Sequence, residues 1–342
     1  MIPDDQLRRR VSGYSKQRLA MIGVPTSAGA HAPGQERAPA AFRAAGIIRA
    51  FGEHGISIDD RGDLPKVRWT PDRRNPRAQH AEQVADVAAS VADAVKSAAA
   101  GGQPDAVLVI GGDCTIEVGV VSGFTRPSER VGLIYLDAGP DLNVPSAVRL
   151  GFLDWMVTAH LLGLPEATQP LSHIGPRFPL LDPDQIVFVG AVPDEFTDWE
   201  KHTVAASALQ MIWVDEVKEN PAGAAQKALS SLEDRVDRIL VHFDVDVVDF
   251  IDFPAADFPT INAGLTLTEA LECVQQCVQH PKFAALTVCE FNPDHVDEEH
   301  KLVRTFVEQS RTSTVGPSVE TELVALDVLH HDARLVVAIG RQ

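Results

Sequence analysis

Short apolar runs rich in β-branched residues alternate along this chain with longer segments of helical periodicity. Continuous apolar runs of this length are typical of parallel strands that are buried on both faces. One stripe of valines at helical spacing ends near Gly101 and Gly102, and a second clear helix is predicted over residues 265–280. The alternation predicts a mostly parallel sheet with helices on both faces. The expected strands are residues 18–23, 106–110, 131–136, 186–190, 211–214, 239–243 and 285–289.

The pattern continues without a break that would divide the chain into domains. No low-complexity linker, internal repeat or shift of composition separates one part of the 342 residues from another, and 45% of them are hydrophobic. That fraction is sufficient for a sizeable core. We therefore expect one domain over residues 1–342, with a polar N-terminal segment (1–17) and a C-terminal extension of unassigned role (315–342).

The charge and the apolar content exclude several classes of partner. A formal net charge of −18 argues against nucleic acids and anionic membranes, because both would repel the protein. The N-terminal residues contain no apolar core of signal-peptide length, and nowhere do about 18 apolar residues run together. Four cysteines are too few for a disulfide scaffold. These features lead us to expect a soluble, cytoplasmic protein.

Three segments run from a predicted strand into an acidic turn: "VLVIGGDCT", "LIYLDAGPD" and "LVHFDVDVVD". In parallel sheets, binding sites form where the carboxyl ends of the strands meet. Clustered carboxylates repel one another unless they share a proton or a cation. Oxygen ligands suit Mn²⁺, Mg²⁺ or Ca²⁺, and a thiolate shifts the preference towards Zn²⁺. Spacing alone leaves open whether these aspartates bind metal or only close turns. The residues that could share one crevice are Cys114, Asp137, Asp141, Asp244 and Asp246.

The chain as a whole resembles the ureohydrolase superfamily, which includes arginase, agmatinase and formimidoylglutamase. Six blocks carry the resemblance in the same order as in the family, which is far more specific than any single block. They are "IGVPTSAGAHAPGQERAPAAFRAAGI", "DRGDL", "GGDCTIEVGVVSG", "LDAGPDLN", "HFDVDVVD" and "VCEFNP".

The resemblance implies a fold and a chemistry. The fold is a single three-layer α/β/α domain with a mostly parallel central sheet of roughly eight strands, assembled into a homo-oligomer, either a trimer or a hexamer. The activity is metal-dependent hydrolysis of a C–N bond in a small guanidino or amidine compound. Two Mn²⁺ ions activate the water that attacks the planar carbon, and an amine departs.

Four aspartates match the metal-binding pattern of the family. Asp137 and Asp244 fall where carboxylates bridge both ions, Asp141 where one binds the first ion, and Asp246 where one binds the second. Mn²⁺ is therefore the expected cofactor, as one or two ions, with Zn²⁺ and Ni²⁺ as alternatives.

The histidine ligands of the family are not retained. Cys114 lies where one ion usually has a histidine, and a thiolate is an alternative ligand there. Gly139 lies where the second ion has its histidine, and glycine cannot ligate through a side chain. None of the 12 histidines falls on a ligand position of the family. His242 is interpreted as a packed or supporting histidine rather than a ligand.

The substrate pocket implied by the resemblance is altered as well. Val148, Leu150 and Phe152 stand where arginases place Thr, Ser and Asn against the α-carboxylate and α-amine of the substrate. Apolar side chains cannot replace those hydrogen bonds, so free L-arginine is not the expected substrate.

Four polar residues remain as candidates in this pocket. Asp154 aligns with a histidine thought to shuttle protons, and Glu290 lies where a glutamate orients the substrate. Asn143, Arg149 and the apolar Phe152 are further candidates for substrate contacts, although a solvated loop residue is the favoured interpretation of Arg149.

Two kinds of function follow from this mixture of retained and lost residues. The retained aspartates and Glu290 favour a metal-dependent C–N hydrolase. The lost histidines favour the alternative, a catalytically silent or repurposed member of the fold that serves as a binding or regulatory subunit.

Overall fold

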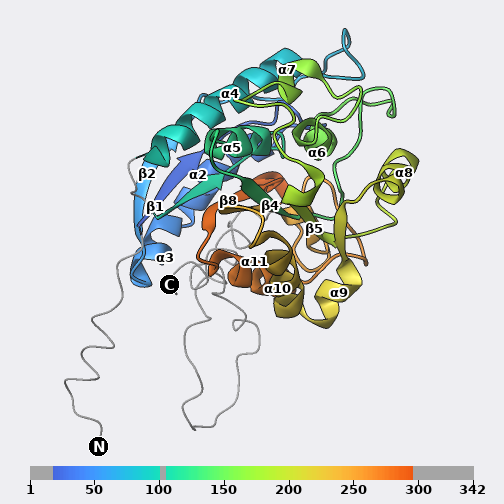
Figure 1. The fold of residues 1–342 in the computed structure, drawn as a ribbon. Coiled ribbons are helices and arrows are strands. Elements are labelled where there is room, and N and C mark those ends of the chain that lie inside the picture. The colour runs from blue at the N-terminus through green and yellow to red at the C-terminus, as the bar shows by residue number, and fades with distance from the viewer. Residues whose placement is uncertain (1–17, 101–104, 296–342) are drawn as a thin grey trace, which may run out of the picture.

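The computed structural model describes residues 18–100 and 105–295, which form three layers around one parallel sheet (Figure 1). The strands are β1 (Arg18–Gly23), β2 (Ser57–Asp63), β3 (Ala106–Ile110), β4 (Val131–Leu136), β5 (Ile186–Ala191), β6 (Gln210–Trp213), β7 (Arg238–Asp244) and β8 (Phe283–Cys289). All pairings in this 8-stranded sheet are parallel, in the order β2-β1-β3-β8-β7-β4-β5-β6. The predicted α/β/α architecture is confirmed. The predicted segments 1–17 and 315–342 lie outside the described residues.

Helices cover both faces of the sheet. Their bounds are α2 (Ala38–Ala44), α3 (Ile47–Glu53), α4 (Ala81–Ala98), α5 (Ile116–Phe124), α6 (Val157–Leu161), α7 (Gln169–Ser172), α8 (Asp198–Ala206), α9 (Val214–Glu219), α10 (Pro221–Leu232) and α11 (Leu267–Val278). One layer contains α4, α5, α6 and α7, and the opposite layer contains α2, α3, α9, α10 and α11 (Figure 1). Within the described ranges, no helix is both long enough and apolar enough to cross a membrane.

The sequence pattern explains why the elements form where they do. Every residue of β3, β4 and β5 is buried, as expected for strands covered on both faces. In α4 the predicted valine stripe packs inward against the sheet and α5. At the start of α11, Thr266 Oγ1 accepts a hydrogen bond from the Glu269 amide, and the Glu269 carboxylate accepts one from the Thr266 amide. This capping box fixes the first turn of the helix.

Four adjacent central strands, β3, β8, β7 and β4, position the candidate site. Their carboxyl ends lie at one edge of the sheet because all four run in the same direction. Tyr135 on β4 pairs with His242 on β7, and Asp244 pairs with Cys289 on β8. Residues two apart on a strand point to the same face of the sheet, so the side chains of His242 and Asp244 lie on one face.

Candidate functional site

A cavity of about 290 Å³ opens at the carboxyl ends of the central strands. Cys114 and Asn143 line it, as do aromatic residues at Trp155 and Phe258. No lysine or arginine is among its lining residues in the described part of the chain. The lining residues that bear carboxyl groups are Asp141, Asp154, Glu195, Glu200, Asp244, Asp246 and Glu290. The cavity is therefore strongly acidic and favours a positively charged occupant.

Different residues of the site lie at the carboxyl ends of different strands. Cys114 lies between β3 and α5, and Asp137 directly follows β4. Asp244 is the last residue of β7, and Glu290 directly follows β8. Asp246 lies in the short 3₁₀ helix Val245–Val247 just beyond β7. The segments that the sequence singled out therefore converge, as predicted from parallel strand topology.

Four buried side chains form a compact group of metal-ligating atoms. Cys114, Asp137, His242 and Asp244 each place one such atom within 4.8 Å of the others. Cys114 Sγ lies 3.3 Å from His242 Nε2 and 2.8 Å from Asp244 Oδ2, to which the thiol donates. His242 Nε2 is 4.0 Å from Asp137 Oδ2.

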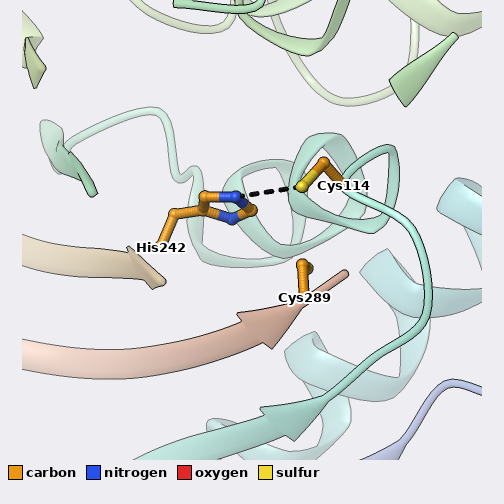
Figure 2. A group of neighbouring side chains, drawn as sticks. All are labelled: Cys114, His242 and Cys289. Atoms are coloured by element: carbon orange, nitrogen blue, oxygen red, sulfur yellow. Dashed lines mark hydrogen bonds between the residues drawn. The ribbon is translucent and has the colours of Figure 1, made fainter. Parts of the chain in front are cut away.

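Cys289 extends this group on one side. Its sulfur lies within 4.8 Å of ligand atoms of both Cys114 and His242, so these three residues form an overlapping group. Figure 2 shows the imidazole of His242 and the thiol of Cys114 facing one another, with Cys289 beside the pair. The pair Cys114–His242 is common to both groups.

The aspartates of the site stand in an environment that disfavours their negative charge. Burial and the carboxylates of Asp246, Asp141 and Asp244 raise the pKa of Asp137 well above its usual range. Burial and the neighbouring Asp246 likewise raise the pKa of Asp244, and burial raises that of Asp246 to about 6. A divalent cation would offset this repulsion.

One oxygen in particular fits a bound ion. Asp137 Oδ1 accepts a hydrogen bond from the Gly139 amide at 2.7 Å. Asp137 Oδ2 is buried and has no hydrogen-bond partner among the described residues. Buried polar atoms are normally satisfied, so an unpaired carboxylate oxygen beside a thiol and an imidazole indicates a place for a cation.

The donor set fits one ion better than two. Asp141 lines the cavity but lies outside the 4.8 Å group, and its Oδ2 accepts a hydrogen bond from the Tyr135 hydroxyl. At Gly139 an added Cβ would lie 3.5 Å from Asp141 Oδ1 and 3.6 Å from Asp137 Oδ1. Position 139 thus faces the carboxylates and contributes no ligand. A second ion would have only carboxylate ligands there and would lack the histidine implied by the resemblance.

Glu290 and Asp154, the expected catalytic residues, are both buried in the cavity wall. Glu290 has a φ of 59° and accepts hydrogen bonds from the Cys114 amide and Gln35 Nε2, each at 3.0 Å. A glutamate rarely adopts this left-handed conformation, so the surrounding contacts must hold it there.

Asp154 has one free oxygen in the cavity wall. Its Oδ1 accepts a hydrogen bond from the Trp155 amide at 2.9 Å, whereas its Oδ2 has no hydrogen-bond partner in the described ranges. Burial and the carboxylates of Asp113 and Asp141 raise the pKa of Asp154 well above its usual range. A protonated carboxyl group in such a position can donate a proton.

The other expected substrate contacts are placed unevenly. Asn143 lines the cavity, but its Oδ1 accepts a hydrogen bond from Thr197 Oγ1 at 2.8 Å. Arg149 is exposed and is not among the lining residues. Phe152 is half-buried beside Trp155, with ring centroids 6.2 Å apart, and is also outside the lining.

Sequence reasoning missed several residues that shape the site. His242 was interpreted as a packed or supporting histidine, and its Nε2 lies within 4.8 Å of potential ligand atoms of Cys114, Asp137 and Asp244. Glu117 is a fully buried acid whose Oε2 lies 3.3 Å from His242 Nδ1. Its signal was available, since Glu117 is the single charged residue in the apolar helix α5. Tyr135 and Cys289 gave no such signal, because both read as ordinary strand residues.

Comparison with known proteins places this geometry in a family. The model of the Arginase family matches residues 17–318. Arginase from Bacillus caldovelox is 27% identical over 292 residues, covering 84% of this chain and 95% of that protein. Its solved structure superposes with a TM-score of 0.74. Human arginase-1 is 27% identical over 293 residues, covering 84% of this chain and 88% of that protein.

A further solved structure shares the fold. Proclavaminate amidino hydrolase from Streptomyces clavuligerus superposes with a TM-score of 0.63 at 22% identity, covering 85% of this chain and 89% of that one.

Proposed function

This chain belongs to the arginase family, and we propose that it hydrolyses a C–N bond of a cationic guanidino or amidine compound with the help of a bound divalent metal ion. One observation carries the proposal. The metal-ligating group opens, through Cys114 and Asp244, onto a cavity that carboxyl groups line and to which no basic side chain of residues 18–100 and 105–295 contributes. A planar cation and a divalent ion both match that charge.

Glu290 is the proposed partner of the substrate cation. Burial and the carboxylates of Asp244 and Asp154 raise the pKa of Glu290 well above its usual range in the ligand-free protein. A guanidinium or amidinium group bound beside it would favour the ionised form and form charge-assisted hydrogen bonds. The substrate would thus provide the positive charge that the cavity wall lacks.

Free L-arginine is a poor match for this cavity. Its α-carboxylate would meet the acidic lining, and Arg149, the nearest basic candidate from the sequence, is exposed outside it. Val148 is buried, Leu150 is 56% exposed, and neither is among the lining residues, so their side chains offer the substrate no hydrogen bond. A compound whose tail is apolar or cationic would avoid an unpaired buried carboxylate and could contact Trp155 and Phe258.

The chemistry follows from the groups around the cavity. When bound, a divalent ion supplies Lewis-acid activation of water. Hydrolysis would add the oxygen of one water to the planar carbon and break the bond from this carbon to the leaving nitrogen, and the two protons of that water would end on the leaving nitrogen. We propose that Asp154, whose Oδ2 is unpaired among the described residues, passes one of these protons to the leaving nitrogen. Glu290 holds the remaining nitrogens in position. A guanidino compound would yield urea and an amine.

Further features of the proposal come from the family resemblance. Dependence on a divalent ion (Mn²⁺ from the resemblance, with Zn²⁺ and Ni²⁺ as alternatives), a cytoplasmic location and assembly into a homo-oligomer, trimer or hexamer, remain predictions. Partners other than a small molecule, in particular nucleic acids and membranes, are not expected at a net charge of −18.

A substrate screen of metal-loaded protein tests the proposal. Release of urea or amine is measured for guanidino and amidine compounds with and without a carboxylate at the far end. We expect turnover of compounds without the carboxylate and little turnover of L-arginine. Asp154→Asn should lower kcat by about 10²–10⁴-fold with little change in KM, because the amide cannot donate the proton as an acid does.

Two outcomes would contradict the proposal. L-arginine as the preferred substrate would show that the carboxylate is accommodated after all. Metal-loaded protein that binds guanidino compounds but turns over none of them would instead support the alternative, a catalytically silent binding protein.

A further inference from the structure

His242 aims its Nε2 atom into the group formed by Cys114, Asp137 and Asp244. The side chains of His242 and Asp137 are 0% and 2% exposed, so bulk solvent reaches neither group. A four-coordinate zinc site has bond lengths of about 2.0–2.3 Å, which places its ligand atoms about 3.3–3.8 Å apart. Here Cys114 Sγ lies 2.8 Å from Asp244 Oδ2 and 3.3 Å from His242 Nε2. His242 Nε2 lies 4.0 Å from Asp137 Oδ2, so the three distances fall on both sides of that range. Small side-chain adjustments would complete a tetrahedral arrangement.

Two neighbours fix the orientation of the His242 ring. Glu117 Oε2 lies 3.3 Å from His242 Nδ1, and both side chains are fully buried. Tyr135 stacks on the ring with centroids 4.2 Å apart and planes 3° apart. A carboxylate on one imidazole nitrogen fixes the tautomer, so that the other nitrogen presents its lone pair to a metal. A buried glutamate is costly unless it is paired, and its contact with His242 accounts for its presence in the apolar helix α5.

The chemistry of the donors selects the ion. Thiolate and imidazole are ligands that zinc binds well, whereas Mn²⁺ prefers sites made of oxygen. A neutral imidazole in place of the Asp141 carboxylate also removes one negative charge from the ligand set. We propose that Cys114, Asp137, His242 and Asp244 bind a single Zn²⁺ ion, with Glu117 and Tyr135 as positioning residues for His242.

The role of this ion rests on the proposed function, but its binding can be measured without any turnover. Asp244 and Cys114 line the cavity, whereas His242 and Asp137 do not. The zinc ion would therefore lie at the cavity wall, reachable from the side of Cys114 and Asp244. Substrate bound beside Glu290 would approach it from there.

Metal content and cobalt spectroscopy test the site on the full chain. Protein stripped with a chelator is dialysed against equal concentrations of Zn²⁺ and Mn²⁺ and its metal content measured. We expect about one Zn²⁺ per chain and almost no Mn²⁺. Substitution with Co²⁺ should give a thiolate-to-cobalt charge-transfer band and the strong visible bands of four-coordination.

Variants assign the ligands. Cys114→Ser should abolish the charge-transfer band, and His242→Ala should abolish stoichiometric zinc binding. Cys273→Ser is the matched control, since Cys273 is equally buried but lies in α11, and it should retain both. A band that survives Cys114→Ser and disappears in Cys289→Ser would overturn the proposed ligand set.

Glu117→Gln separates positioning from structure. The amide oxygen can still accept a hydrogen bond from Nδ1, so the metal-free variant should melt at the wild-type temperature. Its affinity for Zn²⁺ should nevertheless fall about 10–100-fold, because the weaker acceptor makes the imidazole less basic. Unchanged affinity would overturn the positioning role.

The results also separate this inference from the proposed function. Preferential binding of Mn²⁺, or no metal at all, would overturn the zinc site whatever the activity. If the protein bound no metal at all, the positive charge beside the carboxylates of Asp137 and Asp244 would have to be a protonated His242 rather than a metal ion. A zinc-loaded protein that hydrolyses nothing would leave this inference standing and contradict only the proposed hydrolase.

Discussion

Gly139 faces the carboxylates of Asp137 and Asp141 and contributes no ligand of its own. An added Cβ there meets only ordinary contacts, at 3.5 Å and 3.6 Å, and the backbone needs no glycine-only conformation. We therefore expect Gly139→His to add a nitrogen ligand beside Asp246 and to raise metal content from about one to about two ions per chain. Metal analysis after exposure to Zn²⁺ or Mn²⁺ measures the change.

Gly139→Ala is the control for this substitution. It adds the Cβ without a ligand and should leave metal content unchanged. A content of about one ion in Gly139→His would mean that Asp137, Asp244 and Asp246 do not support a second site, even with a histidine in place.

At the residue scale, the sequence identified the acidic side chains at the strand ends but not the position of His242 beside Cys114. Asp137, Asp244 and Glu290 were found because they end strands in recognisable blocks. His242 was not, because its position relative to Cys114 depends on which strands are neighbours and in what register. The buried acid in an apolar helix, Glu117, was the one clue in the sequence that a cationic or ligating group lies opposite.

At the scale of elements, two helices approach closely enough to require glycine. An added Cβ at Gly119 in α5 would lie 2.3 Å from the Ala88 carbonyl oxygen and 2.7 Å from Val91 Cβ in α4. We expect Gly119→Ala to lower the free energy of unfolding by about 1–3 kcal/mol through overpacking, in spite of a gain in helix propensity of about 1 kcal/mol. Denaturant unfolding measures this change.

A second glycine provides the matched control. Gly52 lies in α3 with no atom within 4 Å of an added Cβ. Gly52→Ala should stabilise the protein by about 0.5–1 kcal/mol, since it only restricts the unfolded chain. If Gly119→Ala were equally stabilising, α4 and α5 would have to move apart without any loss of stability, and the overpacking argument would be wrong.

His160 makes the segment around α6 sensitive to acid. Burial lowers the pKa of His160 from 6.5 to about 4, and its Nε2 accepts a hydrogen bond from the Thr168 amide. Because the folded pKa is the lower one, the unfolded chain takes up the proton first as the pH falls. The contribution of His160 to stability is therefore complete above pH 6.5 and is lost between pH 6.5 and about 4. The loss amounts to about 3 kcal/mol at about 1.4 kcal/mol per pH unit.

The difference between wild type and His160→Gln isolates this effect. Glutamine does not titrate, so urea unfolding of the two proteins should differ in pH slope between pH 6.5 and about 4, whatever their stability at neutral pH. Parallel pH profiles would show that His160 is not protonated on unfolding.

The predicted elements failed mainly where burial is low. The strands with continuous apolar runs were found within a residue or two. Strand β2 was missed because it lies at the edge of the sheet and most of its residues, Ser57–Asp63, are polar and exposed. Its hydrogen bonds to β1 come from tertiary pairing, which local propensity cannot indicate.

At the scale of the whole molecule, the sequence predicted the architecture but not the strand order. Alternating strands and helices imply a parallel sheet with its site at the carboxyl ends. The order that brings β3, β8, β7 and β4 together joins segments far apart in the chain. The six ordered blocks of the family resemblance indicated that these segments form one site. Hydrophobic periodicity alone contains no such information.

The charge of the whole molecule should guide the substrate to the cavity. A net charge of −18 and an acidic lining attract a cation over distances comparable with the Debye length. That length falls from about 30 Å at 0.01 M salt to about 8 Å at 0.15 M. We therefore expect kcat/KM for a cationic guanidino substrate to fall by about 10-fold over this range.

Guanidinium and urea offer a matched pair for testing this prediction, because they are nearly the same in shape and differ in charge. The inhibition constant of guanidinium should rise with salt, whereas that of urea should change little, since only the cation gains from the long-range field. Equal salt dependence for both would mean that salt acts on the protein itself. No salt dependence for guanidinium would mean that the bound metal ion already neutralises the field of the cavity, and that recognition of the substrate depends on contacts such as the one proposed for Glu290.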